Sequence, residues 1–156
     1  MMSLLTLKQM SKMDAQHICS WQYEQPYDVY NWPSWQEMCS QDMEFADDSI
    51  REQQYRSLYI GEELAGYIQL FPILQVIRLA IFLSPQHCNQ GLGQYAVGLA
   101  IEAAQKLKAA EIDLEVERWN KRAIACYEKA GFAIADQYSY RQRGSYKDVY
   151  CMVYRG

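Results

Sequence analysis

Two short stretches hold residues whose types and spacing could do chemistry. The first, HCNQGLGQYAVGLA at residues 87–100, puts Gly91 and Gly93 one residue apart, directly before a pattern with helical spacing. Such a turn lets the backbone approach a bound group, and successive amide N–H groups at a helix N-terminus form a cradle for phosphate. The second, LEVERWNKRAIACYEKAGF at residues 114–132, contains carboxylates and Tyr127, which can exchange protons. On spacing alone, that tyrosine fits better as a packed aromatic on the inner face of a helix.

The glycine turn fits more than one ligand. Gly91, Gly93 and Ala96 satisfy the dinucleotide pattern G-x-G-x-x-A. Asp113 and Glu115 follow about twenty residues later, where a ribose-binding acid is expected. The pyrophosphate of coenzyme A is the rival ligand, and an ordinary strand-to-helix turn is a third interpretation. A P-loop is excluded, because no Gly-Lys-Ser/Thr follows the turn.

The composition indicates a single, mildly acidic domain. The chain has 156 residues and a formal net charge of -4 at pH 7, which fits one core. That charge argues against a nucleic-acid partner, whose phosphates select clustered Lys and Arg, and it suits a cationic acceptor such as an amine. The N-terminal apolar run is too short for a signal peptide, and no uncharged apolar stretch is long enough to span a bilayer. We therefore expect a cytoplasmic protein without a membrane partner.

The cysteines argue against a metal centre. The chain has 5 cysteines and 2 histidines, and it lacks a C-x-x-C pair. Zinc ligands normally occur in closely spaced pairs, so we expect reduced thiols and no metal. His87 and Cys88 are adjacent, but neighbours on an extended chain point to opposite faces, which makes a Cys-His nucleophile a poor interpretation.

The residues before the glycine turn predict an edge strand at LLTLKQM, a helix at residues 12–21 and an antiparallel meander. The dense aromatic run at residues 21–35 is irregular. It fits either a cover over a core edge or the wall or lid of an acceptor site. Strands are expected at residues 58–60 and 64–71, joined by a three-residue turn, and at residues 75–85, where apolar density predicts burial on both faces.

From the glycine turn onward, the pattern predicts one crossover unit and a hairpin. A helix to about residue 108 is expected, because apolar residues recur at helical spacing: Leu92, Ala96, Ala100, Ala103 and Leu107. The strand EIDLEVE follows this helix, so it should run parallel to the strand before the turn. Asn120 is a good N-cap for a further helix, and Gly131 stands where a left-handed C-cap belongs. Two strands then surround a turn at Arg143-Gly144.

This element order predicts an α/β fold. We expect a mixed, mostly antiparallel central sheet with one parallel crossover step and flanking helices. A dinucleotide fold would repeat parallel units on both sides of its glycine turn, so the order argues against that ligand.

The two stretches together resemble the GNAT superfamily of N-acetyltransferases. Its pyrophosphate motif is Q/R-x-x-G-x-G/A, whose glycines CNQGLG matches. Its second signature resembles L-E-V-x-x-x-N-x-x-A-x-x-x-Y-x-K-x-G-F, which Leu114–Phe132 matches. The resemblance covers residues 58–154 and, by general layout only, the residues before them. It implies one GNAT-like acetyltransferase domain over residues 1–156, with residues 1–57 on the acceptor side and residues 58–154 as the coenzyme-binding core.

The resemblance also implies a role for individual residues. Backbone amides at the glycine turn would hold the pyrophosphate of acetyl-CoA, and a strand backbone would pair with its pantetheine arm. Tyr127 would be the general acid, and Asn120 both an N-cap and a ligand to the coenzyme arm. Glu115 is the candidate general base, although three acids on one strand face are often just solvated, and Glu24 is a rival. The coenzyme-binding set is Ile81, Phe82, Leu83, Gln90, Gly91, Leu92, Gly93 and Asn120, with Lys121 and Arg122 as candidates for the adenosine 3′-phosphate.

The sequence departs from the family pattern at three positions. Cys88 stands where Gln or Arg is usual, and Asn89 where Gly is frequent. Because that loop binds phosphate mainly through backbone N–H groups, we expect binding to persist. Glu117 replaces an arginine that is common in enzymes acetylating protein N-termini, which argues against a ribosomal-protein substrate.

The expected function is an acetyl-CoA-dependent N-acetyltransferase that moves an acetyl group directly to the primary amine of a small molecule or peptide. The alternative is a non-catalytic acyl-CoA-binding or sensing domain of the same fold, and an interaction module with an aromatic surface is a third option. The sequence does not name the amine. An open sheet edge and surplus aromatics also fit a homodimer.

Overall fold

Seven strands in the described part of the chain form one mixed sheet. The computed structural model describes residues 5–142 and 144–156. In chain order the strands are β1 (Leu5–Gln9), β2 (Tyr55–Ile60), β3 (Glu63–Ile73), β4 (Val76–Leu83), β5 (Glu111–Glu117), β6 (Phe132–Gln142) and β7 (Ser145–Tyr154). Their order in the sheet is β1-β2-β3-β4-β5-β7-β6. Strands β4 and β5 run parallel, whereas the pairs β1–β2, β2–β3, β5–β7 and β6–β7 are antiparallel. The predicted α/β class with a mostly antiparallel sheet and one parallel step is confirmed.

The chain divides into two compact units, each described by itself. The first comprises the described residues up to Gln69 together with Ile81–Leu92. Helix α1 begins at a capping box, in which Ser11 Oγ accepts from Asp14 N at 3.0 Å and the Asp14 side chain accepts from Ser11 N. The helices are α1 (Lys12–Cys19), α2 (Trp35–Ser40) and α3 (Asp48–Gln54), with 3-10 turns at Tyr27–Tyr30, Glu44–Ala46 and Pro85–His87.

Aromatic side chains form the core of the first unit. Phe45 lies edge-on to Trp32 and Tyr55, with ring centroids 5.1 and 5.4 Å apart. Trp32 Nε1 donates to the Tyr67 hydroxyl at 2.9 Å, so these two polar atoms satisfy each other inside an apolar cluster. Part of the aromatic run at residues 21–35 therefore covers a core, which is the first of its two interpretations.

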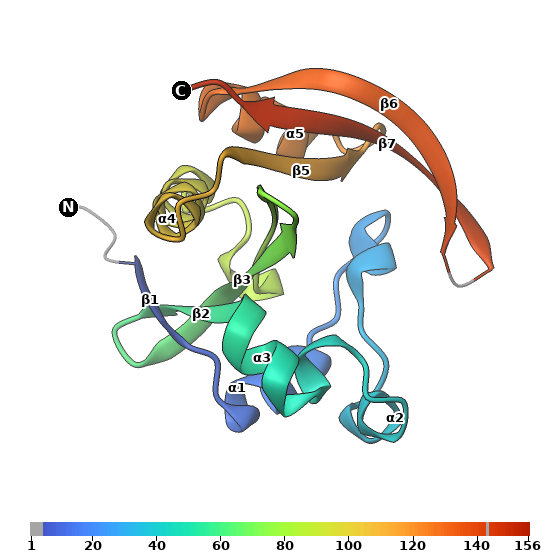
Figure 1. Ribbon diagram of the computed structural model, residues 1–156. Coiled ribbons are helices and arrows are strands. Elements are labelled where there is room, and N and C mark those ends of the chain that lie inside the picture. Colours follow the sequence, from blue (N-terminus) through green and yellow to red (C-terminus); the bar gives the residue numbers. More distant parts are fainter. Residues whose placement is uncertain (1–4, 143) are drawn as a thin grey trace. The chain divides into compact units, whose positions relative to one another are not determined.

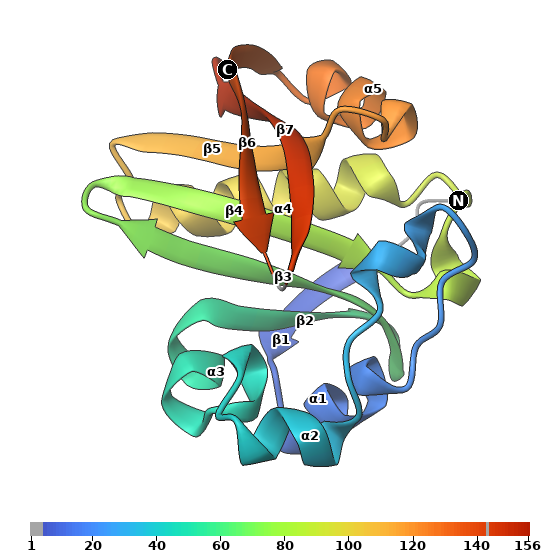
Figure 2. The ribbon, with the colours of Figure 1, turned by 90° about the vertical axis from the view of Figure 1, so that its right-hand side faces the viewer.

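The second unit comprises Leu70–Ala80 and the described residues of Gly93–Gly156. Its helices are α4 (Gly93–Lys106) and α5 (Lys121–Lys129). Figure 1 shows β6 and β7 as a long curved hairpin, and in Figure 2 this hairpin crosses in front of β5 and α4. The predicted hairpin is thus present, although residue 143 of its expected turn lies outside the described residues.

Helix α5 begins and ends where the sequence predicts. The Asn120 side chain accepts from Ala123 N at 3.2 Å, which caps the first turn. Gly131 follows the helix with a φ of +108°, a conformation that costs glycine little. The ring of Phe132 then packs on Tyr127, with centroids 6.0 Å apart. The predicted caps of this helix are confirmed.

Three details of the meander and helix differ from the predictions. Ile60 pairs with Glu63, so the β2–β3 turn has two residues rather than three, with Gly61 at a φ of +60°. Strand β4 is not buried on both faces, because Arg78 occupies one of them. The predicted stripe is confirmed at Leu92, Ala96 and Ala100, which are buried, but Leu107 lies beyond the end of α4 and is 52% exposed. The other buried side chains of this helix are Val97, Ile101 and Ala104. Residue 4 of the predicted edge strand lies outside the described residues, residues 5–9 form β1, and Met10 follows that strand.

Gly66 is expected to be indispensable for the stability of the first unit. A Cβ there would lie 2.4 Å from the Phe82 carbonyl oxygen, a backbone atom that cannot turn aside. We expect Gly66→Ala to lower the free energy of unfolding by about 1–3 kcal/mol or more. The matched control is Gly98→Ala in α4, where an added Cβ meets nothing within 4 Å. That change should be neutral or stabilising by up to about 1 kcal/mol. Urea denaturation of the two variants measures the difference, and equal midpoints would refute the close approach.

Candidate active site

Strand β5 has an apolar face and an acidic face. Successive side chains of a strand point to opposite faces, so Leu114 and Val116 share one face. Asp113, Glu115 and Glu117 share the other, as predicted. These acids are paired rather than solvated: Asp113 is buried, and each of the three carboxylates has a cationic partner.

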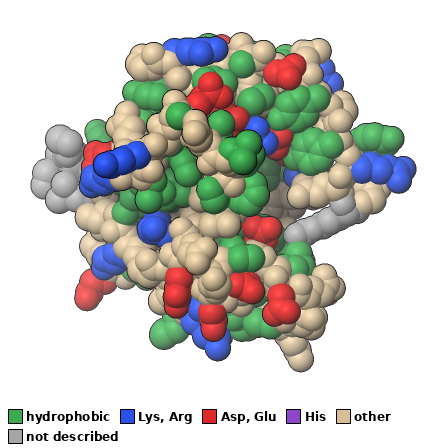
Figure 3. Space-filling view, viewed as in Figure 1, with side chains coloured by type: hydrophobic (Ala, Val, Ile, Leu, Met, Phe, Trp, Pro, Cys, Tyr) green, Lys and Arg blue, Asp and Glu red, His purple; other side chains and the backbone are tan. Residues whose placement is uncertain are grey.

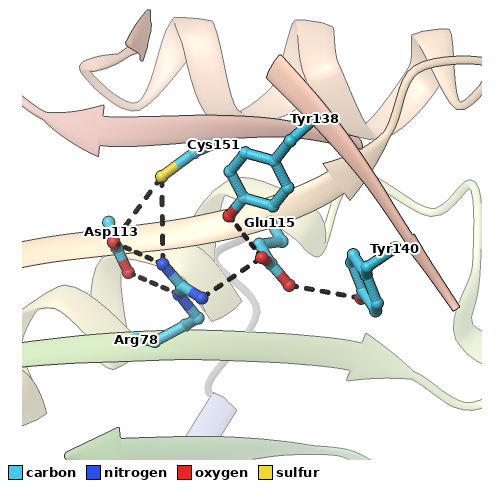
Figure 4. A network of polar contacts seen from close by, with 6 residues as sticks. All are labelled: Arg78, Asp113, Glu115, Tyr138, Tyr140 and Cys151. Atoms are coloured by element: carbon cyan, nitrogen blue, oxygen red, sulfur yellow. Dashed lines mark hydrogen bonds and ion pairs between the residues drawn. The ribbon is translucent and has the colours of Figure 1, made fainter. Parts of the chain in front are cut away.

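A network of polar side chains on the acidic face joins β4, β5, β6 and, through Cys151, β7 (Figure 4). Arg78 donates to Asp113 through Nε at 2.9 Å and through Nη2 at 3.0 Å. Its Nη1 lies 3.2 Å from Glu115 Oε2. The hydroxyls of Tyr138 and Tyr140 both donate to the Glu115 carboxylate, that of Tyr140 at 3.3 Å. The two-pronged contact with Asp113 fixes the plane of the guanidinium and therefore the direction of its third nitrogen.

Charges and burial set the protonation of this network. Hydrogen bonding to Asp113 raises the pKa of the Arg78 guanidinium, so it stays charged. Burial, followed by the hydrogen bond to Glu115, raises the pKa of Tyr138. Burial and the negative charge of Glu115 raise the pKa of Tyr140 to about 12. At neutral pH both tyrosines therefore keep their protons and act as donors to the carboxylate.

Tyr127 lies on the opposite face of this part of the sheet. The register places Leu114 of β5 beside Met152 of β7, and Met152 beside Ile134 of β6. Phe132, two residues before Ile134, shares that apolar face and contacts the Tyr127 ring. Helix α5 therefore packs on the apolar face.

The Tyr127 hydroxyl is a proton donor at neutral pH. Burial, followed by the neighbouring Cys126 and Glu117, raises its pKa, because the phenolate would be poorly solvated and close to negative charge. The structure thus brings the predicted acid and the predicted base to different faces: Tyr127 lies on the helix face and Glu115 on the acidic face.

The start of α4 packs closely against α5. A Cβ added to Gly93 would lie 3.1 Å from Cys126 Sγ, and the Gln94 side chain donates to the Cys126 carbonyl at 2.9 Å. Any side chain at position 93 would therefore press on the residue that precedes Tyr127. Gly91 has a φ of +76°, and an added Cβ there would meet nothing within 4 Å. The backbone of the turn is thus open to a bound group at Gly91 and closely packed at Gly93.

The predicted pantetheine strand, Ile81 to Leu83, is the end of β4 and belongs to the first unit. The Phe82 carbonyl approaches Gly66 of β3, and the Leu83 carbonyl accepts from the Tyr23 hydroxyl at 2.6 Å. Because backbone groups point alternately to the two sides of a strand, Phe82 directs its groups toward β3. The backbone N–H and C=O groups of Ile81 and Leu83 point to the opposite side of the strand, away from β3.

The remaining predicted residues are spread over loops and helix surfaces. Gln90 Nε2 donates to the Gln86 carbonyl at 2.7 Å, which closes the loop before the glycines. Leu92 is buried, so its side chain anchors the turn while its backbone forms it. Three side chains considered as a rival base or as phosphate ligands are exposed: Glu24, Lys121 and Arg122.

Sequence reasoning missed four members of the network, Arg78, Tyr138, Tyr140 and Cys151. Arg78 is a single basic residue in the apolar run QVIRLAIFL, and such an interruption is a usable signal of a buried partner. The two tyrosines alternate in QYSYRQ, which predicts that they share a strand face. Which carboxylate the two tyrosines contact depends on the register of two successive strand pairs. No local sequence pattern determines that register.

The tip of the β6–β7 hairpin follows Tyr140 of the network along β6. Figure 3 shows basic and hydrophobic side chains together there; the Arg141 guanidinium lies 5.2 Å from the Tyr146 ring, which is 71% exposed. Among residues 5–142 and 144–156, no group of three or more His, Cys, Asp or Glu could hold a metal ion. Over the same residues, the helices are too short or too polar to cross a membrane.

Comparisons with known proteins identify the family of this chain. The model of the acetyltransferase (GNAT) family matches residues 15–132. A mycothiol acetyltransferase of Corynebacterium glutamicum is 36% identical over 84 residues, which make up 52% of this chain and 28% of that protein. The chain thus spans less than a third of the length of the curated relatives it matches.

Solved structures share the fold over nearly the whole chain. A chimeric spermidine N-acetyltransferase from Vibrio cholerae has a TM-score of 0.78 at 22% identity, with 97% of this chain and 95% of that chain covered. The spermidine N-acetyltransferase from Vibrio cholerae in complex with CoA and spermine has a TM-score of 0.64 at 20% identity, with 96% and 94% covered.

The Arg78–Asp113 pair is expected to be essential for stability. Arg78→Met would leave the Asp113 carboxylate, whose side chain is 8% exposed, without its cation. We expect a loss of about 1–3 kcal/mol in unfolding free energy, below the value for a fully buried pair because the Arg78 side chain is 28% exposed. Adding Asp113→Asn should recover part of that loss, because a neutral amide is cheaper to bury. Denaturant titration of the double-mutant cycle measures the coupling.

A matched control is Lys106→Met. Its pair with Glu102 is exposed on α4, with side chains 76% and 62% exposed. We expect a change within about 0.5 kcal/mol. An effect of Arg78→Met as small as this one would contradict the proposed importance of the buried carboxylate.

Proposed function

This chain belongs to the acetyltransferase (GNAT) family, and we propose that it uses acetyl-CoA to acetylate a primary amine by direct transfer. The single observation that carries the proposal is the contact of α4 with α5. Gly93 and Gln94 pack on Cys126, so the turn that would bind pyrophosphate and the Tyr127 acid are held on adjoining helices. A phosphate cradle fixed to a protonated tyrosine fits coenzyme A better than it fits a general anion site.

The proposed coenzyme residues fit the group they would hold. When bound, acetyl-CoA supplies an acetyl thioester that an amine can attack. Backbone amides of Gln90 to Gly93 would donate to the pyrophosphate, where the open space at Gly91 leaves room for it. The backbones of Ile81 and Leu83 face away from β3 and would pair with the pantetheine arm. Phe82 fixes that strand through its contact with β3, and Asn120 would contact the arm beside the start of α5.

In this proposal the general acid and the general base are two different side chains. Glu115 would take a proton from the attacking amine, directly or through a water molecule. Tyr127 would return a proton to the departing thiolate. Burial keeps the phenol protonated at neutral pH by raising its pKa, so the proton is present when the thiolate forms. The proposed acceptor is a small-molecule or peptide amine.

Acetyl-CoA is expected to stabilise the protein. At a concentration one hundred times its dissociation constant, a ligand should stabilise by about 2.7 kcal/mol and raise the Tm by roughly 5–10 °C. NADH should produce no such rise. Gly91→Asp should abolish the rise, because it places a charged side chain in the cradle. The matched control is Gly144→Asp at the hairpin turn, where φ is also positive, +82°, and space is also open. A full rise with Gly91→Asp would exclude this turn as the coenzyme site.

The same preparation tests transfer. Acetyl-CoA is incubated with a panel of primary amines, and release of the free thiol is followed together with acetylated product. Turnover with at least one amine is expected. A Tm rise without release from any amine would instead indicate a binding or sensing domain.

Tyr127→Phe is expected to lower kcat by about 10²–10³-fold, because the leaving thiolate loses its proton donor. The Tm rise with acetyl-CoA should stay, since the ring and its packing on Phe132 are kept. Tyr146→Phe at the exposed hairpin tip is the control and should behave as wild type. Unchanged turnover in Tyr127→Phe would remove the acid assignment and leave the coenzyme site untouched.

A further inference from the structure

The two oxygens of Glu115 have unequal surroundings. Oε2 lies 3.2 Å from Arg78 Nη1 and also accepts from the Tyr138 hydroxyl. Oε1 has the longer contact, 3.3 Å, with the Tyr140 hydroxyl. A carboxylate oxygen accepts about two hydrogen bonds. Oε2 is therefore filled by donors of this chain, whereas Oε1 keeps a lone pair.

The donors to Oε2 are held in place by contacts of their own. The Arg78 guanidinium is fixed by its two hydrogen bonds to Asp113. The Tyr138 hydroxyl reaches the carboxylate from β6, on the other side of β7 from β5. Two donors from different strands determine the orientation of the carboxylate more strictly than either would alone. The Glu115 side chain remains 22% exposed, so a substrate can reach it.

We propose that Tyr138 is a positioning residue that, together with Arg78, anchors Glu115 through Oε2 and leaves Oε1 to take the proton of the acceptor amine. This inference rests on the proposed function. In the reaction, the amine nitrogen bonds to the acetyl carbon and the carbon–sulfur bond breaks. The proton leaving the nitrogen goes to Oε1, and the thiolate receives the proton of Tyr127.

The charged and titratable groups around Glu115 come from four strands. They are Arg78 of β4, Asp113 and Glu117 of β5, Tyr138 and Tyr140 of β6, and Lys147 and Cys151 of β7. Glu117 is paired with Lys147 at 3.3 Å, and Asp113 with Arg78. The rate should depend on Glu115 rather than on these two acids, because its side chain is 22% exposed, against 8% for Asp113 and 13% for Glu117.

The decisive experiment compares the variants Tyr138→Phe and Tyr140→Phe. Both changes remove one hydroxyl from the same strand face and the same carboxylate, but from different oxygens. We expect Tyr138→Phe to lower kcat by about 10–100-fold, with the KM for acetyl-CoA unchanged, because a misdirected base slows proton transfer and not coenzyme binding. Tyr140→Phe should lower kcat less. Tyr146→Phe at the hairpin tip should match wild type.

The pH profile separates positioning from a general loss of structure. The ionised carboxylate loses a donor in Tyr138→Phe, so the acidic limb of kcat/KM should move to higher pH by about one unit. All variants are assayed with one amine, whose own ionisation is the same throughout. A general packing defect would lower the Tm and would not shift the acidic limb of the kcat/KM profile.

Four outcomes are distinguishable. Wild-type turnover and an unmoved limb in Tyr138→Phe, or a larger loss in Tyr140→Phe, would overturn the positioning role. Full turnover in Glu115→Gln would overturn it as well, because the base would lie elsewhere. Absence of turnover with any amine in wild type would remove the proposed function itself. A slow Glu115→Gln together with a slow, pH-shifted Tyr138→Phe supports the inference.

Discussion

The buried carboxylate of Asp113 is the constraint that organises the second unit. A carboxylate out of water needs a cation with matching geometry, and Arg78 stands directly opposite it in the parallel ladder. Two of the three guanidinium nitrogens are occupied by Asp113, and the third is directed toward a group on the same face of β5. Glu115, two residues farther along, is that group. One ion pair therefore ties the parallel step of the sheet together and also determines where a second carboxylate points.

Local structure was predictable where the type of one residue determines the backbone conformation. Asn120 and Gly131 mark the ends of α5 because one supplies a side-chain acceptor and the other a positive φ. The parallel step followed from a strand, a helix and a strand, since such a crossover leaves few alternatives. The prediction of β4 as buried on both faces was wrong because it weighed apolar density and discounted Arg78. The predicted length of the β2–β3 turn was wrong by one residue, because two-residue and three-residue turns both accept Gly61.

Some residues of the candidate site were predictable, but the others and their arrangement were not. Family spacing identified Glu115 and Tyr127, and strand alternation correctly grouped Asp113 with Glu115. The sequence contained no information on which β6 residues face them. That depends on two successive registers, β5 with β7 and β7 with β6, and the second contains an irregularity between Ile134 and Asp136. A shift of one residue there would send Tyr138 to the other face. Long-range register is thus the step that local patterns cannot supply.

The separation of Tyr127 and Glu115 onto opposite faces has a chemical consequence under the proposed function. Direct transfer needs a base at the entering nitrogen and an acid at the departing sulfur of one tetrahedral centre, and these two atoms lie on different sides of the carbon. An acid and a base that touched would exchange a proton with each other and not with the substrate. The β4–β5 ladder pairs Leu79 with Leu114 at its end, and β5 continues to Glu117. A thioester lying beside that extension would meet a proton acceptor from the acidic face and a donor from the helix face, and the strand itself would keep the two apart.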